Sequence, residues 1–322
     1  MTPREKFHKA LKREKITGHV PHYELAIYLT MEMIGRMHPS HRIYDGWEQM
    51  SVGEKKSHIT DMAHCYIDIA KKYNHSAISV HTPPRPYGDF EMTRLLFEEI
   101  REQTGDTYSL IQHCDPTLAM LSGANMMEFS ADMYENPEKL REQSKKNIED
   151  TKNLVDKFST HKGLVDGFAM CSDYCFNTNP FFTGEQFDEF IAPYLKETIG
   201  YMREHGFYTI KHTDGNIMPI LNRLVDCEPD ALHSLDPQGG VCLKDVKKLC
   251  GDKVCLIGNV NCGLLQTGTD EEAAADVRRA LREGMDGYGY IFSTSNCIYT
   301  GLPLERYELM HSIWRKEGVY DA

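Results

Sequence analysis

The sequence lacks any long apolar run, any cluster of basic residues and any short, regular spacing of its cysteines. No stretch approaches the roughly 18 apolar residues of a membrane-spanning helix, and the polar N-terminus predicts no cleavable signal. The formal net charge is −12 and no segment is rich in Lys or Arg, so binding to nucleic acid or to an anionic membrane is not expected. Ten irregularly spaced cysteines fit a reducing compartment. We therefore expect a cytoplasmic enzyme.

The sequence also lacks the glycine fingerprints of nucleotide-binding folds. No G-x-G-x-x-G motif follows the first apolar stretch and no P-loop is present, which argues against an open, doubly wound sheet. Eight apolar stretches are instead predicted as strands, over residues 19–27, 76–81, 107–113, 163–173, 206–216, 230–236, 254–259 and 287–294.

Helical patterns separate these stretches and begin and end the chain. The predicted helices cover residues 2–15, 61–73, 92–103, 137–158, 184–205, 217–227, 244–250, 269–284 and a last segment from 304. Because the connections are short and the composition does not shift, we predict one α/β domain over residues 1–322, a closed (β/α)8 TIM barrel. The N-terminal helix and a helical insertion at 28–57, after the first strand, lie outside the repeat. An open, doubly wound sheet is the alternative.

Polar side chains stand where the predicted strands end. They are Glu24, His81, His113, Asp173 with Tyr174, His212 with Asp214, Asp236, Asn259, and Cys297 after the last strand. In a TIM barrel the carboxyl ends of all strands meet at one face, where the active sites of this architecture lie. We therefore predict that these residues, which are far apart in the sequence, share one active site.

A metal site is the sharpest prediction from this set. His212 and Asp214 are two residues apart, so they project from the same side of a strand. Together with Cys297 they are residue types that bind zinc, and three protein ligands with one open position are typical of a catalytic zinc site. In the alternative interpretation, Cys297 is a small buried hydrophobic residue, while His212 and Asp214 only hydrogen-bond a substrate.

Several motifs together resemble one superfamily across nearly the whole chain. They are Thr2-Pro-Arg-Glu with the later Pro21, Phe187-Asp-Glu-Phe-Ile-Ala-Pro-Tyr194, His212-x-Asp-Gly-Asn216, Gly258-Asn-Val260 and Ser295-Asn-Cys-Ile-x-x-Gly-Leu-Pro303. In these motifs the chain resembles the uroporphyrinogen decarboxylase superfamily, a group of barrels that includes corrinoid-dependent methyltransferases.

Two sequence features distinguish this chain from the true uroporphyrinogen decarboxylases of the superfamily that it resembles. Those enzymes are expected to carry arginines just after the first strand, to hold the carboxylates of a porphyrinogen, and an aspartate at the end of the second. Here the first region reads His22-Tyr-Glu-Leu-Ala-Ile-Tyr28, and the second strand ends at His81. An acidic chain without those arginines offers little positive charge to a tetrapyrrole with several carboxylates.

The methyltransferase branch matches better. Its members carry a His-x-Cys motif on the fifth strand and a cysteine after the eighth as zinc ligands, which implies such a role for His212 and Cys297. Asp214 stands where the thiol-alkylating relatives have cysteine. Exchange of a thiolate for a carboxylate leaves a stronger Lewis acid, which favours polarising an oxygen over binding a thiolate. The expected substrate is therefore a methyl ether.

The resulting prediction is a zinc-dependent methyltransferase that moves a methyl group from a methoxylated small molecule to a corrinoid on a partner protein. The predicted catalytic residues, which would orient the substrate or deliver a proton, are Asp173, Tyr174 and Glu24. The predicted substrate-binding residues are His81, His113, Asp236 and Asn259. A uroporphyrinogen decarboxylase-type lyase acting on a tetrapyrrole, and a non-catalytic small-molecule-binding barrel, are the alternatives.

Overall fold

A curled sheet of seven parallel strands forms the centre of the computed structural model, which describes residues 1–320 except 45, 82–89, 122 and 124. Neighbouring strands follow each other in sequence order. They are β2 (Ala77–Val80), β3 (Ser109–Cys114), β4 (Gly167–Met170), β5 (Tyr208–Thr213), β6 (Ala231–Ser234), β7 (Cys255–Val260) and β8 (Tyr290–Thr294). Seven of the eight predicted strands are therefore present, in the order that a TIM barrel requires, and the predicted TIM-barrel fold class is confirmed.

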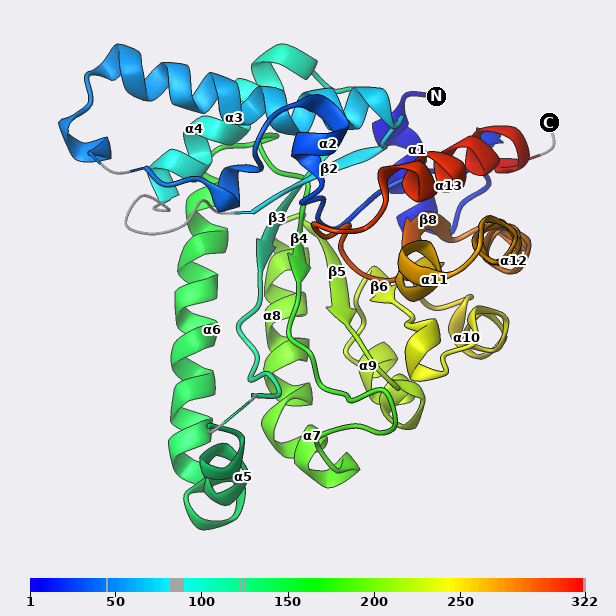
Figure 1. Cartoon of the computed structure of the whole chain (residues 1–322). Coiled ribbons are helices and arrows are strands. Elements are labelled where there is room, and N and C mark those ends of the chain that lie inside the picture. Colours follow the sequence, from blue (N-terminus) through cyan, green and yellow to red (C-terminus); the bar gives the residue numbers. More distant parts are fainter. Residues whose placement is uncertain (45, 82–89, 122, 124, 321–322) are drawn as a thin grey trace.

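Helices surround this sheet, as Figure 1 shows, and the strand arrows point toward the end where α5 and α7 lie. The long helices are α1 (Pro3–Leu11), α3 (Val52–Lys72), α4 (Phe90–Thr104), α5 (Asn125–Glu135), α6 (Pro137–Ser159), α8 (Ala192–Glu204), α10 (Leu243–Cys250), α12 (Asp270–Met285) and α13 (Leu304–Glu317). The short ones are α2 (Thr30–Ile34), α7 (Gly184–Phe190), α9 (Leu221–Asp226) and α11 (Cys262–Thr267). Within the described residues, no helix combines the length and the apolar character needed to cross a membrane.

The first predicted strand is the main error of the sequence analysis. Of residues 19–27, only His19 lies in a strand: β1 (Gly18–His19) pairs antiparallel with β9 (Val319–Tyr320) near the end of the chain. Pro21 has no N–H group, so a regular ladder cannot run through this segment.

The irregular segment that follows β1 nevertheless fills the place of the first barrel strand. On one side the Tyr23 N–H donates to the Phe292 carbonyl of β8 (3.0 Å), and the Phe292 N–H donates to the Pro21 carbonyl (2.8 Å). On the other side the Ser76 N–H, just before β2, donates to the His22 carbonyl (2.7 Å). The segment thus connects the two edges of the sheet.

The insertion after this segment is helical, as predicted for 28–57. It holds α2 and two 3₁₀ turns, Pro39–His41 and Trp47–Gln49. Helix α3 begins at Val52, nine residues before the predicted start at 61. Ser51 caps it: its hydroxyl accepts from the Glu54 N–H, and the Glu54 carboxylate accepts from the Ser51 N–H. This capping box starts the helix on a polar turn that hydrophobic periodicity does not mark.

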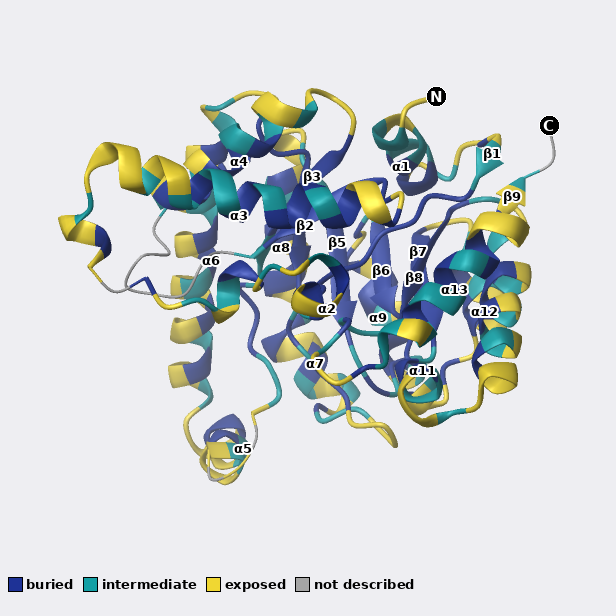
Figure 2. Cartoon of the chain, turned by 45° about the horizontal axis from the view of Figure 1, so that its top comes forward, coloured by how far each residue is buried: buried dark blue, intermediate teal, exposed yellow. Residues whose placement is uncertain are grey.

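The interior of the barrel is built in layers. One apolar cluster is formed by inward side chains of the strands together with Phe7, Ala10 and Leu11 of α1, and Figure 2 shows these strands buried. Its strand members include Ala77, Ile111, Ala169, Ile210, Ala231, Ile257 and Ile291. Side chains two residues further along a strand share the same face. The next layer toward the carboxyl ends is therefore polar: Ser79, His113, Cys171, His212, His233 and Ser293.

Candidate metal centre and active site

Three candidate ligands meet at the carboxyl ends of β4 and β5. One ligand atom each of Asp173, His212 and Asp214 lies within 4.8 Å of the others. The Nε2 atom of His212 is 3.8 Å from Oδ1 of Asp173 and 3.7 Å from Oδ1 of Asp214. The chain turns sharply at Gly215, where φ is +80° and a Cβ would approach the Phe176 carbonyl to 2.6 Å. Glycine is needed there, and the turn holds Asp214 against the loop that carries Asp173.

The other nitrogen of His212 is occupied by a second histidine. The register of β5 and β6 places His212 directly opposite His233. Their Nδ1 atoms are 2.7 Å apart, and Nε2 of His233 is 3.3 Å from the Ser293 hydroxyl. Burial lowers the pKa of His212 to about 4, against the opposing charge of Asp173, so the ring is neutral at neutral pH. A neutral imidazole with its Nδ1 side engaged presents Nε2 as the ligand atom.

Asp214 is held in an environment that disfavours its charge. Burial raises its pKa to about 7, and the nearby negative charge of Asp173 adds to this. The Asn296 side-chain amide donates to Oδ2 of Asp214. Oδ1 is buried and accepts no hydrogen bond from the described residues. A carboxylate oxygen without a donor, beside a second carboxylate and an imidazole nitrogen, is the arrangement that a bound cation would stabilise.

The structure brings together two of the three predicted metal ligands, His212 and Asp214, with Asp173 as the third member of the group. Cys297 lies outside the group formed by Asp173, His212 and Asp214. Burial raises the pKa of its thiol to about 11, with Asp214 adding to the shift, so it stays protonated in the absence of a metal. Asp173, predicted as a catalytic residue, occupies the third position, and its Oδ1 also accepts from the Asp214 N–H (2.9 Å).

Tyr174 points away from this group. Its hydroxyl lies 2.6 Å from the Thr117 hydroxyl, and its ring packs under the ammonium of Lys211, 4.4 Å from the ring centre. The side chain is fully buried, and burial keeps the pKa of the phenol well above its ordinary value. These contacts are those of a residue that supports the strand ends, and a catalytic role for Tyr174 stays a prediction.

Glu24 is also surrounded by protein donors. Its Oε2 atom accepts from the Ser293 hydroxyl (3.1 Å) and the Thr294 N–H (3.2 Å). Its Oε1 atom lies 3.3 Å from Nε2 of His22 and accepts from the Tyr307 hydroxyl (3.4 Å). The carboxylate is completely buried. It ties the irregular first segment to β8 and α13, and one side chain, Ser293, links it to His233 of the His212–His233 pair.

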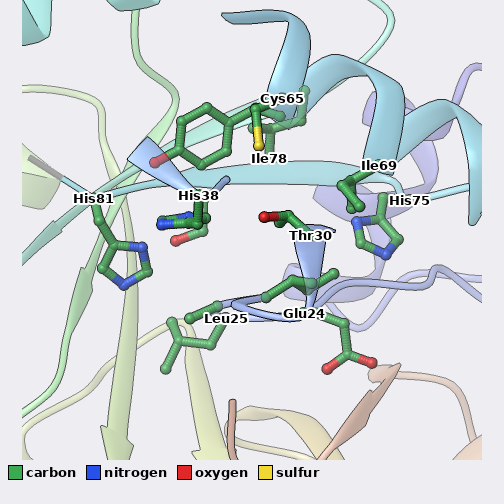
Figure 3. A pocket seen from close by; sticks show the side chains of 13 residues that line it. Glu24, Leu25, Thr30, His38, Cys65, Ile69, His75, Ile78 and His81 are labelled. Carbon is green, nitrogen blue, oxygen red and sulfur yellow. The ribbon is translucent and has the colours of Figure 1, made fainter. Parts of the chain in front are cut away.

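His81 and His113 form a separate pair of rings at the ends of β2 and β3. Their centres are 4.5 Å apart, and burial lowers the pKa of both. His81 also lines a cavity of about 30 Å³ between the first segment and α3. Figure 3 shows His38 beside His81 in this cavity, and Glu24 on its opposite side. A cavity of this size holds one or two water molecules. It is too small for an organic substrate.

The two remaining predicted substrate-binding residues, Asp236 and Asn259, are both buried and hydrogen-bonded by the protein. Oδ1 of Asp236 accepts from the Gln238 N–H (2.9 Å), and burial raises the pKa of this carboxyl. Asn259 is fully buried, donates to the Leu235 carbonyl (2.7 Å) and accepts from Arg279 (3.0 Å). Its amide is therefore engaged by the protein on both sides, and Oδ2 of Asp236 likewise accepts from the Gly215 N–H (3.4 Å).

Sequence reasoning missed His233 and Ser293 as members of the site. Both lie inside predicted strands rather than at their ends, where polar residues were sought. The alternation of inward and outward side chains could have placed His233 in the polar layer, but its pairing with His212 depends on the β5–β6 register.

Comparison with known proteins agrees with this architecture. A methyltransferase from Methanosarcina mazei superposes with a TM-score of 0.74, over 98% of this chain and 99% of its own, at 17% sequence identity. A β-mannanase from the blue mussel Mytilus edulis does so with a TM-score of 0.50, over 95% of this chain and 97% of its own, at 10% identity. At such identities the likeness shows a shared fold. No match was found among curated protein sequences.

A family model gives the decisive match. The model of uroporphyrinogen decarboxylase (URO-D) matches residues 116–316, which cover more than half of the chain and include β4 to β8 with Asp173, His212 and Asp214. The chain therefore belongs to the uroporphyrinogen decarboxylase family.

Proposed function

We propose that this protein is a methyltransferase that takes a methyl group from the oxygen of a methoxylated small molecule and passes it to the cobalt of a corrinoid on a partner protein. In this reaction the carbon–oxygen bond breaks, the reduced cobalt supplies the electron pair for the new bond to carbon, and the oxygen takes up a proton. The observation that carries the proposal is the group Asp173, His212 and Asp214 at the strand ends, with its free carboxylate oxygen.

The donor set fits a zinc ion. One imidazole nitrogen and two carboxylate oxygens are ligands that zinc accepts, and three protein ligands leave a fourth position open for a substrate. The unpartnered Oδ1 of Asp214 and the Nε2 atom of His212 lie 3.7 Å apart. Zinc bound there would act as a Lewis acid toward the oxygen from which the methyl group departs.

The protein side chains around this position have distinct tasks. The Asp173 side chain is 42% exposed, against 7% for His212 and 24% for Asp214. It is therefore the side chain best placed to contact a substrate as well as a cation. Asp214 and His212 are held from behind, by Asn296 and by His233. The neutral rings of His81 and His113 give the neighbouring wall an aromatic surface without charge.

The family name keeps the lyase as a second candidate, because it denotes decarboxylation of a tetrapyrrole with several carboxylates. Residues 22–28 carry no arginine to bind such groups. Lys211 is the cationic residue of β5, and its ammonium is already neutralised by Asp115 at 2.7 Å. The charge around the candidate centre therefore favours an uncharged substrate over a polyanion.

Metal analysis of the protein, purified without added metal or chelator, tests the proposal. We expect close to one zinc per chain, and loss of the metal with retention of the fold in His212→Ala, because a catalytic metal in a large barrel is not needed for folding. His113→Ala changes another histidine of the same layer and should keep the metal. Cys297→Ser should also keep it, since Cys297 lies outside the group; zinc loss in that variant would restore the predicted ligand set.

Activity assays then separate the two reactions. Reduced corrinoid should be methylated from a methoxylated donor, and Asp214→Ala should slow the transfer more than about 100-fold, beyond the 10–100-fold typical of residues that only support a ligand. Release of carbon dioxide from a porphyrinogen, without metal and without corrinoid methylation, would establish the lyase instead.

A further inference from the structure

Four buried side chains form a continuous chain of polar contacts from the irregular first segment to the candidate metal centre. Glu24 accepts from Ser293 (3.1 Å), Ser293 lies 3.3 Å from Nε2 of His233, and Nδ1 of His233 lies 2.7 Å from Nδ1 of His212. The chain crosses the polar layer of the barrel and links β8, β6 and β5. All four residues are at most 6% exposed, so bulk water cannot rearrange it.

The direction of each hydrogen bond follows from the carboxylate at its start. The Thr294 N–H can only donate, and it binds Oε2 of Glu24, so this oxygen is an acceptor at its contacts. Ser293 has one hydroxyl proton and gives it to Glu24. The Ser293 oxygen must then accept at its contact with His233, which places a proton on Nε2 of His233.

The positions of the protons on His233 and His212 then follow. The His233 ring is 1% exposed and its hydrogen-bond partners, His212 and Ser293, are not carboxylates, so a second proton would leave a buried charge without a counter-ion and the ring carries a single proton. With that proton on Nε2, Nδ1 of His233 is bare and accepts. The proton in the 2.7 Å contact therefore sits on Nδ1 of His212. A neutral His212 then has a bare Nε2, the atom that faces Asp173 and Asp214.

We propose that Glu24, Ser293 and His233 are positioning residues that fix the Nδ1–H tautomer of His212 and so prepare its Nε2 atom to bind a metal. The proposal rests on the proposed function only for the identity of the bound ion. It assigns Glu24 a role at a distance from the substrate, through two intervening side chains.

The carboxylates around His212 favour the opposite tautomer, so this assignment can be tested. Without a metal, the two carboxylates at 3.7 and 3.8 Å attract a proton to Nε2, which is the opposite tautomer. If Glu24, Ser293 and His233 only packed against one another, the two carboxylates would determine the tautomer of His212. Only a directed chain that begins at Glu24 holds the proton on the far side of the ring.

Nitrogen NMR of protein labelled with ¹⁵N-histidine, in the metal-free state, reports the tautomer directly. The His212 signals are identified by their absence in His212→Gln. We expect wild type to show a protonated Nδ1 and a bare Nε2 at His212. Ser293→Ala should shift His212 toward the Nε2–H form and weaken zinc binding, measured by competition with a chelator, by roughly 10–100-fold. Ser293→Thr keeps the hydroxyl and should restore both properties.

Ser79→Ala is the matched control, because Ser79 is a buried serine of the same layer, on β2, outside the chain of contacts. It should leave the tautomer unchanged and zinc affinity within about twofold of wild type. An Nε2–H tautomer in wild type, or equal behaviour of Ser293→Ala and Ser79→Ala, would refute the proposal. The expected tautomer in a wild-type protein that binds no zinc would uphold the chain of contacts and reject the zinc.

Discussion

A lysine with a fully buried side chain lies next to the candidate centre, and its ion pair with Asp115 shapes the strand ends. The Lys211 ammonium donates to Asp115 (2.7 Å) and to the Ser172 carbonyl (3.0 Å). Lys211→Met leaves the Asp115 charge buried without its partner, so we expect a loss of about 3–5 kcal/mol in the free energy of unfolding. Chemical denaturation measures this. The double variant Lys211→Met with Asp115→Leu should recover much of the loss, and equal stability of both variants would show that Asp115 does not need the lysine.

The same carboxylate gives the protein a defined acid sensitivity. Burial alone would raise the pKa of Asp115, but the charge and hydrogen bond of Lys211, with those of Thr117, outweigh it and hold the pKa below its ordinary value. The unfolded chain then binds more protons than the folded one as pH falls. This contribution to stability is complete above the ordinary aspartate pKa of about 3.9 and is lost below it.

Asp115→Asn tests this sign. The stability difference between wild type and variant, measured from pH 7 to pH 3, should be constant at first and shrink as the pH drops below about 4. A difference that stays constant, or that grows toward low pH, would contradict the lowered pKa.

At the scale of single elements, the N-terminal cap of α3 can be tested by its contribution to stability. Ser51 supplies the cap, through a hydroxyl that accepts from the Glu54 N–H at 3.3 Å. Ser51→Ala should lower the free energy of unfolding by about 1 kcal/mol. Ser57→Ala, an exposed change on the same helix, should stay within about 0.5 kcal/mol of wild type. If the two variants cannot be distinguished, the first turn of α3 is not anchored by its cap.

The elements that sequence predicted well are those with a strong apolar pattern. The strands β2 to β8 are short, buried runs between helices, and each was placed from that pattern. The first strand was wrong because Pro21 prevents a regular ladder, while its neighbouring apolar residues still imitate one. The start of α3 was late because the residues from Val52 to Ser57 are mostly exposed, and exposed turns leave no hydrophobic period.

The candidate centre was predictable where two ligands share one strand. His212 and Asp214 could be paired because alternation along β5 is a local property. The proximity of Asp173 to them depends on how the β4 and β5 loops pack around Gly215, and the contact with His233 depends on register. Neither contact can be read from a single segment of the sequence. Asp173 was therefore predicted as a catalytic residue rather than a metal ligand, and His233 was not predicted as part of the site.

At the scale of the whole molecule, closure of the sheet by the irregular segment can be tested by hydrogen exchange. The N–H groups of Tyr23, Phe292 and Ser76 make the closing bonds. We expect their protection to match that of the amides in the centre of β4 and β5, because breaking these closing hydrogen bonds would expose both sheet edges. Rapid exchange at Tyr23 and Phe292, with slow exchange in β5, would show a sheet that opens independently of the rest.

The seam between residues 21–23 and Phe292 has a consequence for synthesis of the chain. The first of these residues leave the ribosome long before the last strand is made, and at 5–20 residues per second the delay is on the order of tens of seconds. During that time the side of residues 21–23 that pairs with Phe292 is an edge without a partner, because β8 is not yet made. An edge of this kind pairs readily with other chains. Newly made protein should therefore depend on chaperones until translation is nearly complete, and slowing the ribosome late in the message should increase aggregation.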